Sequence, residues 1–175
     1  MAQLIMEDDC LVPQGQIIIN YKGPNPFRAV QKTAEFLRRI WEVEAKDYWE
    51  RQFRYNPDED PRGFYLNAYV KKGLDRFTSV VIEVVMQGKQ PSDPNKEGTV
   101  EIRIGGVLKT RFGGNTVFDD IKNPLARSFY WFYDKYFHKK QRVNYLNLWC
   151  RKKLMELRRR YQELLGITPT DEVRV

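Results

Sequence analysis

The side chains of this sequence that could do acid–base, nucleophilic or metal chemistry are few, and they do not cluster. The chain has one histidine, His138, between an aromatic block and a basic run, and two cysteines, Cys10 and Cys150. A lone histidine is a weak general-base candidate, so we interpret it as a surface or interfacial residue. One histidine and two distant cysteines cannot complete a zinc site, so we expect no metal. We expect no cofactor, since neither glycine pair, at 105–106 or 113–114, resembles a phosphate-binding loop.

The remaining candidates for chemistry each have a simpler interpretation. Cys150 falls on the apolar side of the last predicted helix, which favours a small buried hydrophobe over a nucleophile. The acidic cluster Asp58–Asp60 lies between two prolines and is typical of a solvated turn, with a cation site as the alternative. An enzyme of the cyclase or hydrolase type would need polar groups that converge in a cavity, such as Tyr65, Asn67 or Glu83. The sequence therefore identifies no catalytic residue and leaves enzymatic activity open.

Length and composition indicate one soluble domain. The chain has 175 residues, of which 42% are hydrophobic, 30% charged and 14% aromatic, enough apolar material for a buried core. No apolar stretch is long enough to span a bilayer, and the start of the chain turns acidic within Met1–Asp9, before a signal-peptide core could form. Two cysteines do not make a disulfide framework. We therefore expect a cytoplasmic protein.

Positive charge is concentrated near the end of the chain. Residues Ile121–Gly166 carry 12 Lys or Arg against three acids, whereas the remainder carries 18 against 20. A solvated helix face is the ordinary explanation of such runs, but solvated faces usually mix signs. The bias predicts a polyanionic partner, which could be nucleic acid or an anionic membrane surface. The candidate polyanion-binding residues are Lys139, Arg142, Arg151, Lys152, Arg158 and Arg159.

Hydrophobic periodicity predicts the order of the elements. A β-branched strand at Gln16–Tyr21 precedes an amphipathic helix at Pro26–Trp41. Period-two patterns then predict strands at 49–55, 64–71, 77–86, 99–104 and 107–112, with Gly105-Gly106 as a tight turn. The turns are too short for crossover helices, which favours an antiparallel meander. Helical spacing returns at Leu125–His138 and Arg142–Leu165.

This order of elements resembles the START-like, helix-grip superfamily of polyketide cyclases, pollen allergens and lipid-transfer domains. The resemblance covers Gln16–Gly166 and rests on element order and length alone. It implies an α+β fold in which a curved antiparallel sheet wraps around the long C-terminal helix. Residues 1–15 and 167–175 are then expected to be N-terminal and C-terminal tails of a single domain.

The function we predict is binding of an apolar or amphipathic small molecule in a cavity between sheet and terminal helix. The expected lining residues are Phe64, Leu66, Val81, Ile102, Phe132, Leu146 and Leu157. The aromatic block at 129–137 holds seven aromatic residues, which cannot all lie on one helical face. Some of them must point outward or into a pocket, where they would form a ligand wall or a partner surface. The alternative function is a nucleic-acid or ribonucleoprotein-binding module that uses the basic C-terminal helix.

Overall fold

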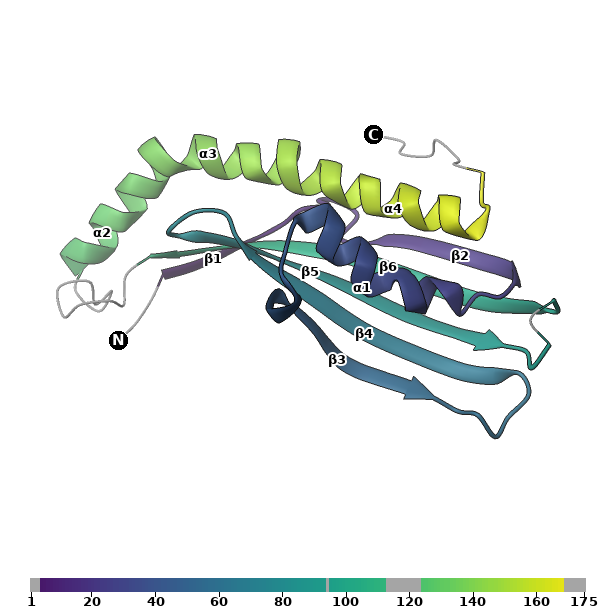
Figure 1. Ribbon diagram of the computed structural model, residues 1–175. Coiled ribbons are helices and arrows are strands. Elements are labelled where there is room, and N and C mark those ends of the chain that lie inside the picture. Colours follow the sequence, from purple (N-terminus) through teal and green to yellow (C-terminus); the bar gives the residue numbers. More distant parts are fainter. Residues whose placement is uncertain (1–3, 94, 113–123, 169–175) are drawn as a thin grey trace.

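Long strands of alternating burial and a long C-terminal helix build the molecule (Figure 1). The structure is a computed structural model, and it describes residues 4–93, 95–112 and 124–168. The strands are β1 (Leu4–Asp9), β2 (Ile17–Pro24), β3 (Tyr48–Tyr55), β4 (Arg62–Gly73), β5 (Thr78–Gln90) and β6 (Glu97–Phe112). The helices are α1 (Arg28–Trp41), α2 (Pro124–Tyr133), α3 (Lys139–Asn144) and α4 (Arg151–Leu165). Short π-helical segments, Asp134–His138 and Tyr145–Cys150, join α2, α3 and α4 into one continuous helical run.

All six strands belong to one antiparallel sheet, in the order β1-β6-β5-β4-β3. The long strand β6 has two partners along the same edge, since Glu97–Ile104 pairs with β2 and Val107–Phe112 pairs with β1. The pairing of β4 with β5 is antiparallel over its whole length, as the period-two pattern predicts. The α+β class, the antiparallel sheet and the long C-terminal helix are confirmed, and the sheet is open rather than closed into a barrel.

The turn predicted at Gly105-Gly106 is wrong, because β6 runs straight through both glycines. Gly105 pairs with Glu83 and Gly106 with Ile82 in the middle of the sheet. A Cβ on Gly106 would lie 2.8 Å from Ile82 Cδ1 and 3.0 Å from Leu154 Cδ1 of α4. Because Gly106 has no side chain, the helix and the sheet can approach each other closely. The local sequence does not reveal this contact.

The N-terminal segment also differs from the prediction. Residues 1–15 are expected to be a tail, whereas Leu4–Asp9 forms β1 against the end of β6. Three successive acids, Glu7–Asp9, weaken the local strand signal. In the sheet this acidic end meets basic neighbours, and Glu7 pairs with Lys109 at 2.8 Å. Tertiary pairing, not local propensity, makes this segment a strand.

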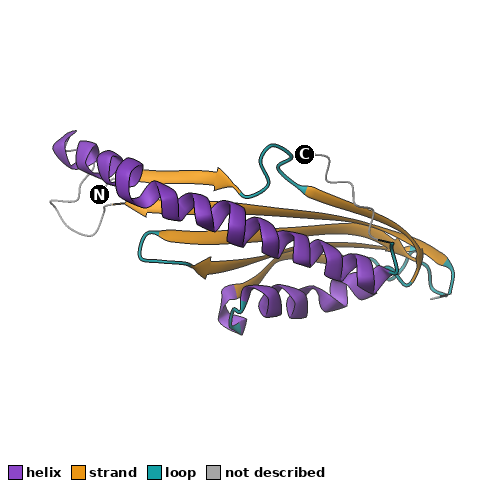
Figure 2. Cartoon of the chain, turned by 90° about the horizontal axis from the view of Figure 1, so that it is seen from above, coloured by secondary structure: helices purple, strands orange, loops and turns teal. Residues whose placement is uncertain are grey.

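Both α1 and α4 cover the same face of the sheet, and Figure 2 shows the long helix crossing over the strands. The apolar side of α1 buries Ala29, Leu37 and Trp41, and that of α4 buries Leu154, Leu157 and Leu165. The hydroxyl of buried Tyr161 donates to Thr33 Oγ1 at 3.1 Å, which ties the two helices together. Among the described residues no helix covers the opposite face of the sheet, called here the uncovered face. None of the described helices is long and apolar enough to cross a membrane.

A disulfide joins Cys10, directly after β1, to Cys150, at the start of α4. Cys150 is buried, as the sequence predicts, but its sulfur is bonded rather than free. The two residues are 140 positions apart in the chain. They meet because β1 and α4 pack at the same end of the core, which is information that no local spacing contains. The bond fixes the helical run to the N-terminal strand.

We predict that loss of this disulfide strongly destabilises the fold. Closing a loop of this length restricts the unfolded chain, and its removal should lower the free energy of unfolding by about 4–5 kcal/mol. Urea unfolding with and without a reductant measures the change. The double variant Cys10→Ser/Cys150→Ser is the control, since reductant should not alter its midpoint. Equal midpoints for reduced and oxidised wild-type protein would contradict the prediction.

Candidate functional site

The first part of the helical run, Pro124–Cys150, is called here the arm. In Figures 1 and 2 its α2 portion lies beyond the ends of β1 and β6, whereas α4 lies over the sheet. The inner side of the arm packs on the ends of the strands. Tyr130 stacks on Phe112 with ring centroids 5.8 Å apart, and Tyr133 meets Phe112 edge to face at 6.1 Å. The arm thus has one side held by the sheet and one side free for other contacts.

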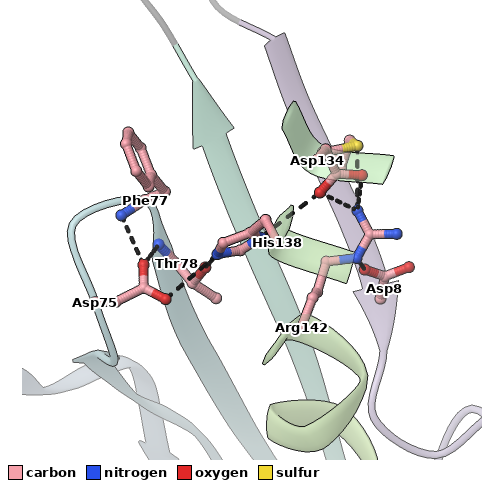
Figure 3. A network of polar contacts seen from close by, with 8 residues as sticks. Asp8, Asp75, Phe77, Thr78, Asp134, His138 and Arg142 are labelled. Atoms are coloured by element: carbon pink, nitrogen blue, oxygen red, sulfur yellow. Dashed lines mark hydrogen bonds and ion pairs between the residues drawn. The ribbon is translucent and has the colours of Figure 1, made fainter. Parts of the chain in front are cut away.

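His138, on the inner side of the arm, lies at the centre of a polar network between the arm and the sheet (Figure 3). Its Nε2 is 3.3 Å from Thr78 Oγ1 and 3.4 Å from Asp75 Oδ2, both near the β4–β5 turn. On the other side of the ring, Nδ1 faces Asp134 Oδ1 at 3.6 Å. The residue is only 3% exposed, so of the two positions expected from the sequence, surface or interfacial, the surface one is wrong. The π-helical segment turns His138 toward the sheet while Phe137 and Lys139 on either side stay exposed.

Arg142 extends this network to the N-terminal strand. Its Nη1 donates to both carboxylate oxygens of Asp134, at 3.1 and 3.2 Å, and its Nε lies 3.2 Å from Asp8 Oδ2 of β1. The guanidinium is largely buried by these contacts. Arg142 is one of the predicted polyanion-binding residues, and the structure instead commits it to holding the arm on β1.

The network around His138 anchors the arm on the ends of the strands. His138 meets the rings of Phe77 and Phe112 edge to face, at centroid distances of 6.3 and 5.6 Å. Its hydroxyl neighbour, Thr78, is also buried. In the described part of the chain, little of the imidazole surface is therefore exposed. Within the described residues no group of three or more potential metal ligands lies together.

The outer side of the arm carries a cluster of exposed aromatic residues. Five of them, between 49% and 66% exposed, form what we call the aromatic patch: Phe129, Trp131, Phe132, Tyr136 and Phe137. Phe132 and Tyr136 lie with ring centroids 4.5 Å apart. A hollow of about 600 Å³, lined mainly by Phe129, Trp131 and Phe132, opens on this side. The prediction that part of the aromatic block points outward is confirmed.

Cations lie beside the aromatic patch, and no exposed acid within the arm, residues 124–150, offsets them. Lys135, Lys139 and Lys140 are exposed beside it. The ammonium of Lys135 lies 4.7 Å from the ring centroid of Trp131, a cation–π contact. Asp134 is the sole acid in the sequence from 124 to 150, and it is buried against Arg142. The outer side of the arm is therefore both apolar and purely cationic.

Of the other predicted polyanion-binding residues, Lys139 lies on the arm, and the remaining four lie farther along the helical run, on α4. Lys139, Lys152 and Arg159 are exposed, and Arg151 and Arg158 are half-buried. Here the signs mix, since Arg159 pairs with Glu163 at 3.3 Å and Arg160 with Glu156 and Glu163. The cationic bias seen in the sequence is thus strongest on the arm and weaker on α4.

The residues expected to line a cavity are only partly brought together. Phe64, Leu66, Ile102 and Leu157 join one hydrophobic core and are 0–3% exposed. A side chain beside a ligand-sized cavity would keep accessible surface, so the space around these four is filled. Leu146 is half-buried at the edge of the core. The last two lie elsewhere, since Val81 points to the uncovered face and Phe132 to solvent.

The polar groups that an enzyme would need do not lie on the side of the sheet that faces the core. Tyr65, Asn67 and Glu83 alternate with buried core residues and lie on the uncovered face. Glu83 forms an ion pair there with Arg51 at 3.1 Å. The cluster Asp58–Asp60 lies in the β3–β4 turn, where Asp60 accepts a hydrogen bond from the backbone N–H of Ser92 at 3.0 Å.

Comparison with known proteins identifies no family. No family model matches the chain, and no curated protein matches it. A solved structure with weak similarity is an uncharacterised protein from Rhizobium leguminosarum, which is 10% identical. The match covers 89% of this chain and 99% of that one, with a TM-score of 0.19. At that level the similarity carries no argument about fold or function.

The network around Asp75 predicts acid-sensitive attachment of the arm. Burial raises the pKa of the Asp75 carboxyl, but the backbone N–H groups of Phe77 and Thr78, each at 2.7 Å, and His138 outweigh it. The net pKa lies below the ordinary value of about 3.9. The ionised carboxylate therefore stabilises the fold above that value, and the stabilisation is lost as pH falls through the lower folded-state pKa.

We expect Asp75→Ala to lower the free energy of unfolding by about 1–3 kcal/mol at pH 7. The difference from wild type should shrink as pH falls below about 4, because the wild-type carboxyl then becomes protonated. Urea unfolding at pH 7, 5 and 3 measures both proteins. Asp93→Ala, in the exposed β5–β6 loop, is a control whose difference from wild type should stay small. A constant difference at all three pH values would show that the charge of Asp75 is not responsible.

Proposed function

We propose that this protein docks on anionic membrane surfaces through the outer side of the arm. The observation that carries the proposal is the aromatic patch, with Lys135, Lys139 and Lys140 around it and no exposed acid on the arm. Aromatic side chains that face lipid, combined with lysines at their flanks, are the composition of helices that lie in the membrane interface.

Two energies act together at such a surface. Moving an exposed aromatic side chain out of water is favourable by roughly 1.5–3 kcal/mol when burial is complete. Each Lys or Arg close to an anionic leaflet adds about 1 kcal/mol, and salt screens this part. The patch inserts among the headgroups while the lysine stems reach outward to lipid phosphates. The arm can do this without leaving the sheet, because its inner side stays anchored through Phe112, His138 and Arg142.

A lipid surface fits the arm better than a second copy of the chain. In a symmetric dimer built on this patch, the lysines of one copy would face the same lysines of the other. Like charges at close range oppose such an interface, whereas lipid phosphates neutralise them. The charge pattern thus favours an anionic occupant.

The helix-grip class is part of this proposal. An open antiparallel sheet with a long C-terminal helix across one face supports it, as the order of elements predicts. The apolar ligand that this class often holds has less support, since Phe64, Leu66, Ile102 and Leu157 pack as solid core. The basic face of α4, where Lys152 and Arg159 are exposed, supports the nucleic-acid alternative only weakly because glutamates intervene.

Flotation with lipid vesicles tests the apolar part of the proposal. Wild-type protein should bind vesicles that contain 30% phosphatidylserine and should bind neutral phosphatidylcholine vesicles far less. The variant Phe129→Ser/Phe132→Ser/Tyr136→Ser should bind at least about tenfold more weakly, since most of the inserted apolar area is removed. Phe53→Ser is the matched control, because Phe53 is 48% exposed on β3, away from the arm, and its loss should not matter.

A second triple variant tests the charge. Lys135→Gln/Lys139→Gln/Lys140→Gln should weaken binding at low salt and flatten its salt dependence. A control with the same charge change uses exposed lysines off the arm: Lys46→Gln/Lys71→Gln/Lys96→Gln. Three results would overturn the proposal. In the first, the wild type does not bind anionic vesicles. In the second, sedimentation shows a dimer of the wild type that the arm variants dissociate. In the third, the arm variants weaken oligonucleotide binding while vesicle binding stays intact.

A further inference from the structure

The uncovered face of the sheet is hollowed at the end where β2 and β6 begin their pairing with Pro24 and Glu97. One hollow there has a volume of about 640 Å³ and lies over β2, β6 and β5. A second, of about 300 Å³, lies over β5, β4 and the end of β3. Both are lined by Gln87–Lys89 of β5, so they adjoin along this stretch. We call the two together the sheet trough.

Strand register shows that the sheet trough runs across the strands. One row of aligned residues crosses five strands and consists of Arg54, Tyr65, Gln87, Glu101 and Asn20. The next row consists of Gly63, Lys89, Thr99 and Lys22. Aligned residues of an antiparallel sheet point to the same face, so these side chains stand side by side. Five strands about 4.8 Å apart span roughly 19 Å, which is long enough for several nucleotides.

The sheet trough carries four cations and one acid. The cations are Lys22, Arg54, Lys89 and Arg103, and the acid is Glu101, which forms an ion pair with Arg103. Within the described part of the chain, Lys89 and Arg54 form no ion pair. Lys22 pairs with Glu97 at 3.0 Å, but both side chains are well exposed, and such pairs are weak enough for a phosphate to replace. The charge therefore suits a ligand with more than one phosphate.

Aromatic and amide groups lie between these cations. Tyr65 is half-buried, with Arg54 and Gln87 as its neighbours in the row. Beside it, a Cβ on Gly63 would meet no atom within 4 Å, so the space over this backbone is open. A flat base can lie there against the tyrosine ring. Gln87 and Asn20 offer both donors and acceptors to base edges.

We infer that the sheet trough binds single-stranded nucleic acid, with bases on Tyr65 and phosphates near Lys22, Lys89 and Arg103. Unpaired bases stacked on a sheet surface, with basic side chains along the backbone, are a common arrangement for single strands. A duplex does not fit, since its bases are hidden and, among the described residues, no helix or ribbon projects from this face into a groove. This site goes beyond the proposed function and lies on the face opposite the helices.

The test measures the affinity of the full chain for a fluorescein-labelled 12-nucleotide RNA by anisotropy at 50 and 200 mM NaCl. Tyr65→Ala should weaken binding at least about fivefold and leave the salt dependence unchanged, because it removes stacking alone. Lys22→Gln/Lys89→Gln/Arg103→Gln should weaken binding at low salt and reduce the slope of log K against log[salt] by about 2. Unchanged urea midpoints show that the variants fold.

Two controls separate this site from the other surfaces. Lys71→Gln lies on the same face of β4 but outside the sheet trough, and it should keep wild-type affinity. The aromatic-patch variant Phe129→Ser/Phe132→Ser/Tyr136→Ser should bind RNA normally even if it no longer binds vesicles. The inference is overturned if the wild type does not bind single strands, if a duplex competes equally, or if Lys71→Gln weakens binding as much as Tyr65→Ala. Loss confined to Lys152→Gln/Arg159→Gln would also overturn it and assign binding to α4.

Discussion

The close contact between α4 and the middle of β6 is the constraint on which the remaining structure depends. At Gly106 three elements meet, since a Cβ there would lie 3.0 Å from Leu154 Cδ1, 2.8 Å from Ile82 Cδ1 and 3.4 Å from the Cβ of Cys10. Any larger residue would push the helix away from the sheet. Because the helix can settle here, Cys150 comes within bonding distance of Cys10. The disulfide then fixes where the arm leaves the core, so the position of the aromatic patch follows from a glycine in the sheet.

In the arm, the helical turn decides which aromatic side chains face the sheet and which face solvent. Seven aromatic residues within 129–137 would surround a regular helix, and the structure sorts them with a π-helical turn. Tyr130 and Tyr133 reach Phe112, and His138 reaches Asp75 and Thr78. The remaining aromatic side chains stay exposed to water, so they add no buried apolar area to the fold. The buried charges of the network hold this arrangement in one register, because a shifted helix would leave them unpaired.

Sequence periodicity was sufficient for the elements whose burial alternates regularly. The strands β3, β4 and β5 and the helix α1 lie within a few residues of their predicted bounds, and α4 ends at the predicted residue, Leu165. The start predicted for that last helix, Arg142, lies in α3, because one helical run continues from α3 through the π-helical segment into α4. What it could not predict depends on contacts between distant segments. β1 needs its partner Val107–Phe112, the Gly105-Gly106 pair needs α4 above it, and the disulfide needs both. The position of His138 between an aromatic block and a basic run favours a surface or interfacial residue, and only its contact with Asp75 near the β4–β5 turn shows that it is buried.

The distribution of charge gives the two proposed surfaces compatible orientations. The helices on one side carry the excess of Lys and Arg, whereas three acids gather in the β3–β4 turn at Asp58–Asp60. If the arm docks on an anionic bilayer as proposed, the field would orient the helices toward the lipid and the Asp58–Asp60 turn away from it, since the field acts on the whole charge distribution. The uncovered face of the sheet then points away from the bilayer. A nucleic acid could occupy the sheet trough without displacing the arm, because the core of Leu66, Ile102 and Leu157 separates the two sites.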